Sequence, residues 1–176
     1  AYEFFQFWLN SDDADMPKLL KVFSMKDKAE IERLIETVNT NPGAREAHRE
    51  LAREMTTLVH GAELSSQVED AARALFGQGE ISDLALKTLD SALAQLPKTQ
   101  LKKGEPFPSW VDLLAATGVV DSKSAARRIV KEGGAYLNNK KVESEDFTPS
   151  KDDLLHGKYL LLRKGKRDLA AVEVIS

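Results

Sequence analysis

Cysteine is absent from the 176 residues, which excludes disulfides and thiolate metal sites. No apolar run approaches the length of a membrane-spanning helix, and no basic-then-apolar segment typical of a signal peptide begins the chain. The sequence holds neither a P-loop nor a GxGxxG motif, and its three histidines are too scattered to suggest a metal site. We therefore expect a cytoplasmic protein with no membrane partner, no metal and no bound nucleotide.

The net charge of −3 is small, but charge is distributed unevenly along the chain. Residues 1–97 carry 10 Lys and Arg against 17 Asp and Glu, whereas residues 108–176 carry 12 against 10. The C-terminal half is therefore the candidate for binding a polyanion. Charge alone favours the alternative that this half has an ordinary mixed surface exposed to solvent, because its excess of positive charge is small.

The first 97 residues read as helices, because apolar residues recur three or four positions apart and no strand pattern appears. The longest predicted helix covers Pro42–His60, with Asn41 as its cap and Gly61 as its stop. Its apolar stripe is Ala44, Ala47, Leu51, Met55, Leu58 and Val59. The other predicted helices cover Lys28–Val38 behind the cap Asp27, Ser65–Phe76 before Gly77, and Leu84–Leu96. The early aromatic residues Phe4, Phe5, Phe7 and Trp8 are expected in the core at helical spacing.

A linker is predicted over residues 98–107, because prolines and a glycine in and beside it disfavour helix and sheet alike. We expect an all-helical domain over residues 1–97 before it. The last domain, residues 108–176, reads as a small α+β fold of two helices packed on a small sheet. Its predicted helices are Ser109–Thr117 and Lys123–Glu132, and its predicted strands are Ala135–Leu137, a segment from Val142, Tyr159–Leu162 and Leu169–Ile175. The chain as a whole is therefore of the α+β class.

Basic and polar side chains cluster in the last domain at the second helix and at the turn that follows it. Ser122 caps that helix, and its outer face carries Lys123, Ser124, Arg127, Arg128 and Lys131. A helix N-terminus flanked by hydroxyl and cationic groups can bind phosphate. The next turn offers Asn138, Asn139, Lys140 and Lys141, which can reach phosphates and 2′-hydroxyls of RNA. The alternative is a capped helix with a basic face exposed to solvent.

This helix and hairpin together resemble the small RNA-binding domain named after ribosomal protein S-four, over residues 108–176. Asn139 stands where that family more often has glycine, and asparagine tolerates the positive φ of such a turn.

Two further motifs extend the resemblance to the whole chain. Tyr2–Asn10, followed by Asp12 and Asp13, is similar to the segment after the KMSKS loop of bacterial tyrosyl-tRNA synthetases. Leu58–Gly61, the sequence Leu-Val-His-Gly, is a second hallmark of that family, and Tyr159–Asp168 resembles its C-terminal end. The chain is thus identified as similar to the C-terminal region of this family: an anticodon-binding helical domain, a linker and an S-four-like domain.

The resemblance implies tyrosine tRNA as the partner, with its long variable arm on the S-four-like domain. It adds Arg163, Lys164, Lys166 and Arg167 on the last turn as RNA contacts. For the anticodon we expect contacts from Asp12, Asp13 and the loop residues Ser24, Lys26 and Asp27, of which the three aspartates could accept hydrogen bonds from bases directly.

The resemblance also separates this region from catalysis. The HIGH and KMSKS motifs are absent, so this region is not expected to be an enzyme in isolation. ATP and magnesium would belong to the missing catalytic domain. We expect this region to be monomeric and the intact enzyme to be a homodimer.

Two alternatives stay open at this point. One is an RNA-binding module of another S-four-bearing protein, such as a pseudouridine synthase or a ribosome-associated factor. The other is a structural interaction domain that does not bind RNA.

Overall fold

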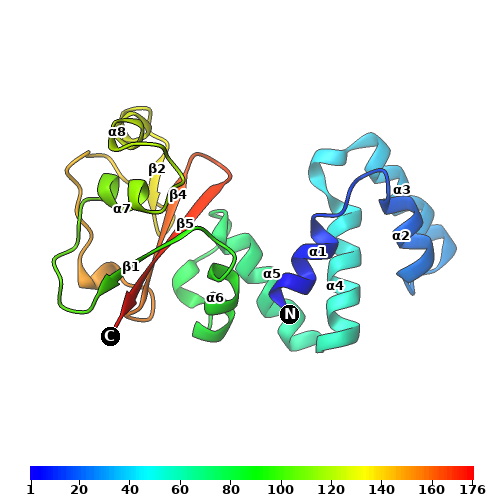
Figure 1. Ribbon diagram of the computed structural model, residues 1–176. Coiled ribbons are helices and arrows are strands. Elements are labelled where there is room, and N and C mark those ends of the chain that lie inside the picture. The colour runs from blue at the N-terminus through cyan, green and yellow to red at the C-terminus, as the bar shows by residue number, and fades with distance from the viewer. The chain divides into compact units, whose positions relative to one another are not determined.

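The computed structural model describes residues 1–176, and its contacts group them into two compact units, Ala1–Asp70 and Ala71–Ser176. The first unit is entirely helical and the second contains the sheet (Figure 1), so the chain is of the α+β class as predicted. Helix α5 (Ala62–Leu75) runs across the division between the units.

Unit 1 is built around the long helix α4 (Glu46–His60), which contacts the three helices that precede it. Those helices are α1 (Tyr2–Leu9), α2 (Met16–Phe23) and α3 (Lys28–Thr40). The side chains of Phe5, Met16, Leu20, Leu34 and Leu51 are fully buried and form the centre of the unit. The predicted cap of α3 is confirmed, because the Glu30 amide donates to the Asp27 carboxylate at 2.9 Å.

The helix predicted from Pro42 is wrong at its start. A 3-10 turn covers Pro42–Ala44, Arg45 adopts a left-handed φ of 48°, and α4 begins only at Glu46. Asn41 makes no side-chain cap. The physical reason is tertiary: the Arg45 guanidinium donates to the backbone oxygens of Leu9, at 2.7 Å, and Ser11, at 3.0 Å, so this residue binds the α1–α2 loop instead of continuing a helix.

Two predictions about the core of unit 1 are also wrong. Leu58 and Val59 belong to the predicted stripe of α4 but are exposed, whereas Ala47, Leu51 and Met55 on the same helix are buried. Among the early aromatics, Phe5 and Trp8 are buried while Phe7 is 66% exposed.

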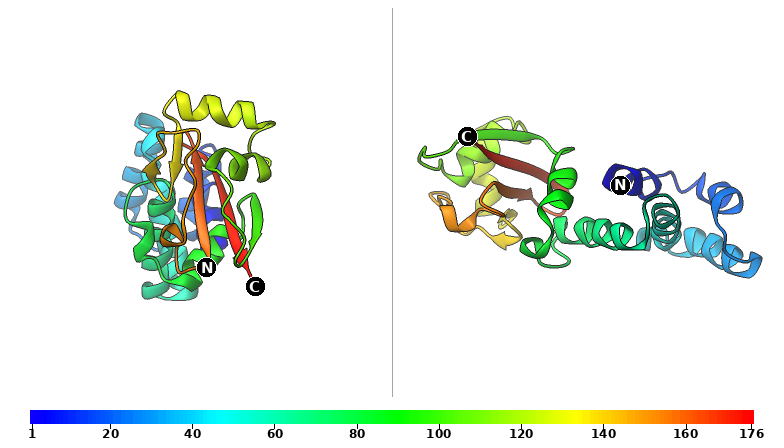
Figure 2. Two further views of the ribbon diagram at one scale, coloured as in Figure 1. Left: turned by 90° about the vertical axis from the view of Figure 1, so that its left-hand side faces the viewer. Right: turned by 90° about the horizontal axis from the view of Figure 1, so that it is seen from below.

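Unit 2 contains one five-stranded sheet in the order β1-β5-β4-β2-β3. The strands are β1 (Lys98–Lys102), β2 (Ala135–Leu137), β3 (Lys140–Lys141), β4 (Tyr159–Lys164) and β5 (Asp168–Ile175). The helices are α6 (Leu86–Leu93), α7 (Trp110–Ala116) and α8 (Lys123–Lys131), with 3-10 turns at Ile81–Asp83 and Lys151–Asp153. Figures 1 and 2 show α7 and α8 on one side of the sheet and α6 on the other.

The core between the sheet and the helices α7 and α8 follows the sequence pattern closely. Trp110, Leu113 and Leu114 of α7 pack with Leu160 and Leu162 of β4, and all five are essentially inaccessible to solvent. Ser109 and Ser122 cap α7 and α8 by accepting the amides of Asp112 and Ala125. These helix starts were predicted from the residue types alone.

The prediction of an irregular linker over residues 98–107 is wrong for its first half. Residues Lys98–Lys102 form the edge strand β1, which pairs in parallel with β5 from Lys98 opposite Ala171 to Lys102 opposite Ile175. Backbone hydrogen bonds along the otherwise unpaired edge of β5 outweigh the weak strand preference of this segment. The prolines that suggested a linker, Pro97, Pro106 and Pro108, lie outside the strand.

Residues 71–97 belong with the sheet and not with the helices before them, so the division falls well before the predicted linker. Three contacts join this segment to the later part of unit 2, residues 98–176. Asn139 Nδ2 donates to the Ala74 oxygen at 2.6 Å, His156 Nε2 lies 2.7 Å from the Leu84 oxygen, and Lys158 Nζ lies 3.5 Å from Asp90. Within residues 71–97 the contacting groups are two backbone oxygens and the carboxylate of Asp90. No pattern in the sequence distinguishes such groups from others of the same kind.

Candidate nucleic-acid interface

Helix α8 presents its basic side chains to solvent because its apolar side is fixed in the core. Ala126 and Val130 are buried beneath it, one turn apart. The opposite side carries the exposed residues Lys123, Ser124, Arg127, Arg128 and Lys131. The structure therefore brings together on one face all five residues predicted there.

The cations of α8 are partly paired with carboxylates. Lys123 Nζ lies 2.6 Å from Asp112 of α7, and this hydrogen bond, with that from Ser109, lowers the pKa of the Asp112 carboxyl. Arg127 and Lys131 share Glu145, at 3.8 and 3.2 Å, and Arg128 lies 3.9 Å from Glu132. Exposed pairs of this kind are each worth about 0–1 kcal/mol, so they present little obstacle to a phosphate.

The last turn of the sheet lies beside the C-terminal end of α8. The Gly165 amide donates to the Gly134 oxygen at 2.7 Å, and Ala135 pairs with Lys164 across β2 and β4. Gly133 has a φ of 72° and leaves room for the Lys141 ammonium, which a Cβ at Gly133 would approach to 3.2 Å. Two glycines thus allow three basic segments to converge, and Figure 2 shows α8 and the β4–β5 turn at the same end of the sheet.

The cations of these three segments differ in whether a carboxylate pairs with them. Lys164 pairs with Asp168 at 3.0 Å. No ion pair engages Lys140, Lys141, Lys166 or Arg167 in the structure, and all four are exposed. These four, with the arginines of α8, form the part of the surface that is most available to phosphates. We refer to the exposed cations of α8, β3 and the β4–β5 turn as the basic surface.

Three residues predicted to contact RNA are instead engaged within the protein. Asn138 Nδ2 donates to the Asp153 oxygen at 2.6 Å, and Asn138 Oδ1 accepts the Leu161 amide at 2.8 Å. The Asn139 side chain binds Ala74, and the Arg163 guanidinium stacks on the ring of Tyr136 at 3.9 Å. Both asparagines adopt positive φ, 46° and 66°, as a two-residue hairpin turn requires. Their side chains therefore have little left to offer to RNA.

In unit 1 the residues predicted to contact the anticodon also differ in whether their side chains are already bonded within the protein. Ser24 donates to Glu54 at 2.7 Å, Lys26 pairs with Glu50 at 3.4 Å, and Asp27 caps α3. These three are held within the fold, whereas the other two predicted residues, Asp12 and Asp13, lie in the α1–α2 loop.

The α1–α2 loop carries three aspartates, and one of them, Asp13, holds the loop against α4. Asp13 lies 3.3 Å from Arg45 and 3.1 Å from Nε2 of the buried His48. Burial lowers the pKa of His48, and the charge of Arg45 adds to this, against the opposing effect of Asp13. Asp12 and Asp15 are exposed and make no such contact, so they are the available carboxylates of this loop.

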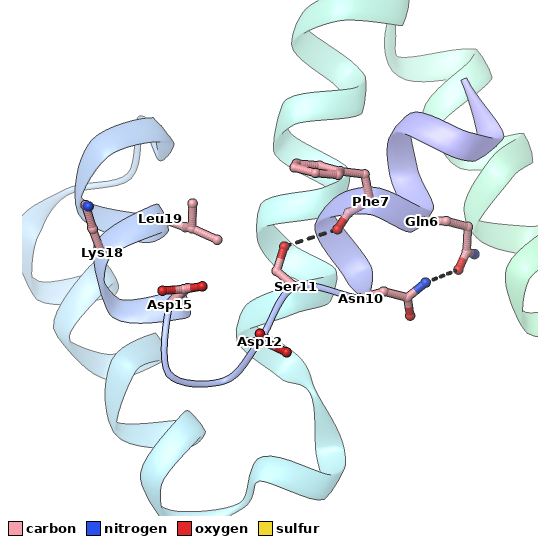
Figure 3. A pocket seen from close by; sticks show the side chains of 8 residues that line it. All are labelled: Gln6, Phe7, Asn10, Ser11, Asp12, Asp15, Lys18 and Leu19. Carbon is pink, nitrogen blue, oxygen red and sulfur yellow. Dashed lines mark hydrogen bonds between the residues drawn. The ribbon is translucent and has the colours of Figure 1, made fainter.

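Asp12 lines a shallow hollow of about 670 Å³ between α1 and α2. Figure 3 shows its lining residues: Gln6, Phe7, Asn10, Ser11, Asp12, Asp15, Lys18 and Leu19. Asn10 Nδ2 donates to Gln6 Oε1 at 3.2 Å, and Gln6 Nε2 is buried without a hydrogen-bond partner. The exposed ring of Phe7 lines the same hollow.

Sequence reasoning missed this hollow, although one signal was available. Tyr2, Phe5 and Trp8 follow one another three residues apart and are buried. Phe7 falls outside that spacing, which places it on the outer face of α1. Nothing else in the sequence indicates that Gln6 and Asn10 border the same hollow as Asp12.

No group of three or more His, Asp or Glu side chains is placed to hold a metal ion. None of the helices is both long enough and apolar enough to cross a membrane.

Two family models together match most of the chain. Residues 1–77 match the model described as tRNA synthetases class I (W and Y). Residues 88–172 match the model described as the tyrosine–tRNA ligase SYY-like C-terminal domain.

Individual relatives match nearly the whole chain. A tyrosine–tRNA ligase of Streptomyces avermitilis is 56% identical over 98% of this chain and 40% of its own length. Those of Thermobifida fusca and Corynebacterium efficiens are 49% and 47% identical over 97% and 98% of this chain. The chain spans about 40% of the length of these curated relatives. A C-terminally truncated mitochondrial tyrosyl-tRNA synthetase of Aspergillus nidulans, 32% identical, aligns with a TM-score of 0.41 over 43% of this chain and 22% of that one.

Proposed function

Because this chain belongs to the tyrosine–tRNA ligase family and forms the C-terminal region of that enzyme, we propose that it recognises tyrosine tRNA for ligation. Unit 1 would meet the anticodon, and the basic surface of unit 2 would bind the long variable arm. The observation that carries the proposal is the basic surface itself, which gathers cations from three segments around Gly133 and Gly134 within a domain of this family.

The hollow of unit 1 has the chemistry to hold an unstacked base. An exposed aromatic ring such as Phe7 gives a stacking surface, and base stacking on aromatic side chains contributes about 1–3 kcal/mol per base. The Asp12 carboxylate, which lines the hollow, can accept hydrogen bonds from base amino and imino groups. We therefore propose Asp12 as the principal contact of the five predicted residues. Asp13, Ser24, Lys26 and Asp27 would act mainly by holding the two loops in place.

The basic surface would bind phosphates and carry no base recognition. Its exposed arginines and lysines lie on a helix face and a turn, which suits the backbone of a double-stranded arm. Ser122 and Ser124 at the start of α8 add hydroxyl donors beside the helix N-terminus. Of the predicted contacts, Lys123, Arg127, Arg128, Lys131, Lys140, Lys141, Lys164, Lys166 and Arg167 remain in the proposal. Binding of this kind should weaken steeply with salt.

In the intact enzyme, catalysis would reside in the part of the chain outside this region. ATP and magnesium would bind there, and the same part would form the homodimer, while this region alone would be monomeric. We propose a cytoplasmic location for the enzyme. A module of another S-four-bearing protein is disfavoured, because the ligase relatives match both units and not the second unit alone.

The test is a titration of this chain with labelled tyrosine tRNA at two salt concentrations, set against the same tRNA with a shortened variable arm. Weaker binding to the shortened arm, with a smaller salt dependence, supports the proposal. Equal binding to both tRNAs would instead indicate RNA binding without recognition of the arm. A Phe7→Ala variant, tested with an anticodon stem-loop, probes unit 1 separately.

A further inference from the structure

A second hollow, in unit 2, adjoins the basic surface. It has a volume of about 450 Å³ and is lined by residues of the β2–β3 hairpin and of the segments around the 3-10 turns Ile81–Asp83 and Lys151–Asp153. Lys140 and Lys141 are among them, so β3 belongs both to the basic surface and to the rim of this hollow. Its volume is within the range of about 300–1,000 Å³ that is typical of small-molecule sites.

The inner wall of this hollow is apolar. Leu137 and Val142 are buried in the core of unit 2, and Phe147 and Leu154 are half-buried against the same core. Because all four side chains line the hollow, a ligand that enters it meets an aromatic ring and aliphatic groups. Proteins bind unpaired bases of RNA by stacking them on aromatic side chains, so this wall suits the flat face of a base.

Hydrogen bonds hold the walls of the hollow in place. Asn138 Nδ2 donates to the Asp153 oxygen at 2.6 Å and so fixes the second of the two 3-10 turns beside the hairpin. His156 Nε2 lies 2.7 Å from the oxygen of Leu84, the residue directly after the first turn. The hollow is therefore formed before any ligand binds, and a preformed site loses less binding free energy to the ordering of its residues.

Four charged side chains at the rim have no partner within the protein. Lys140 and Lys141 make no ion pair, and the carboxylates of Glu80 and Asp152 neither pair with a cation nor accept a hydrogen bond. All four are exposed, and all four line this one hollow. Free charges of both signs suit a ligand that carries an anionic group together with hydrogen-bond donors. A nucleotide is such a ligand, because its phosphate can bind an ammonium group and the amino group of its base can donate to a carboxylate.

We infer that this hollow binds one unpaired nucleotide of the tRNA whose backbone lies on the basic surface. The base is adenine, cytosine or guanine, because only these bases carry an amino group that can donate to Asp152 or Glu80. Its flat face lies on the apolar wall, and its phosphate lies beside Lys140 or Lys141. This inference rests on the proposed binding of tRNA by unit 2, and it adds contact with a base beside a surface that itself binds only phosphates.

The test neutralises both free carboxylates and keeps the shape of the hollow. One variant combines Glu80→Gln with Asp152→Asn. The control combines Glu143→Gln with Asp146→Asn, which neutralises two exposed carboxylates of the same unit that do not line the hollow. Each chain is bound to tyrosine tRNA, and the unpaired bases are probed with dimethyl sulfate and a carbodiimide, which together modify the pairing edges of all four bases. Circular dichroism verifies the fold of both variants.

The unaltered chain should protect one adenine, cytosine or guanine outside the anticodon loop. The variant with Glu80→Gln and Asp152→Asn should lose this protection and bind the tRNA about tenfold more weakly, because a hydrogen bond to a charged group is lost. The control should keep the protection and bind at least as tightly as the unaltered chain, because it removes two negative charges that repel RNA.

The same protection in both variants, with salt-dependent binding retained, would overturn the inference and leave the proposed function standing. Protection of a uracil alone would also overturn it, because uracil has no amino group. If the unaltered chain bound no tRNA at low salt, the proposed function would fail and this inference would fail with it.

Discussion

Replacing Arg127 and Arg128 together with alanine tests the basic surface most directly. Both side chains are exposed on α8, and their ion pairs to Glu145 and Glu132 are long, at 3.8 and 3.9 Å. Neither arginine contributes to the core beneath the helix, where Ala126 and Val130 are buried. Loss of stability should therefore stay within about 0.5 kcal/mol, as for surface substitutions generally.

The expected effect on tRNA binding follows from counterion release. Each phosphate contact contributes roughly 0.9 to the slope of log affinity against log salt, so two lost contacts reduce the slope by about 2. At 0.1 M salt the variant should bind about thirtyfold more weakly, and a fourfold rise in salt should narrow that gap about tenfold. These are upper values, because contacts to Glu145 and Glu132 are given up when phosphate binds.

The assay is a fluorescence titration of tyrosine tRNA at four salt concentrations, with circular dichroism to verify the fold. The control pairs Lys28→Ala with Arg33→Ala on α3, which removes two exposed cations from acidic unit 1. An unchanged slope in the α8 variant with an intact fold would refute the assignment of this helix. An equal reduction in the control would show that net charge alone, and not this surface, governs binding.

Three further predictions concern the fold around the sites. Asn138→Gly keeps the positive φ of the turn but removes the side-chain hydrogen bonds to Asp153 and Leu161. The free energy of unfolding, measured in urea, should fall by about 2–4 kcal/mol, and unchanged stability would contradict the structural role of Asn138. Gly133→Ala places a side chain at a φ of 72° and should lower the free energy of unfolding by about 1–2 kcal/mol in the same measurement. The only atoms near the new Cβ belong to the end of the long Lys141 side chain, which can move aside, so a much larger loss would mean that the backbone also clashes. Burial lowers the pKa of His48 below its ordinary value of 6.5, so as pH falls the unfolded chain binds a proton at this residue before the folded chain does. The free energy of unfolding should therefore decrease below about pH 6.5, by at most about 1.4 kcal/mol per pH unit. His48→Gln should flatten this dependence in thermal melts between pH 5 and 7.5, and an identical profile would exclude His48 as its source.

The class of the fold, most of the helices and the face of α8 that carries the cations can all be predicted from the sequence. Local rules suffice for these features: Ser109, Ser122 and Asp27 cap the helices that follow them, and apolar spacing selects the buried side. The resemblance to the synthetase family also came from short contiguous motifs, which need no knowledge of contacts between distant residues.

Features that depend on residues distant in the sequence could not be predicted in this way. Residues 98–102 became a strand because β5 offers an unpaired edge, and α4 began late because Arg45 binds the loop after α1. For the same reason the side chains of Asn138 and Arg163 make contacts within the protein, and Leu58 is exposed although it lies on a stripe that local spacing directs inward. Periodicity specifies which side of an element is apolar, but whether that side is buried depends on what the rest of the chain brings against it.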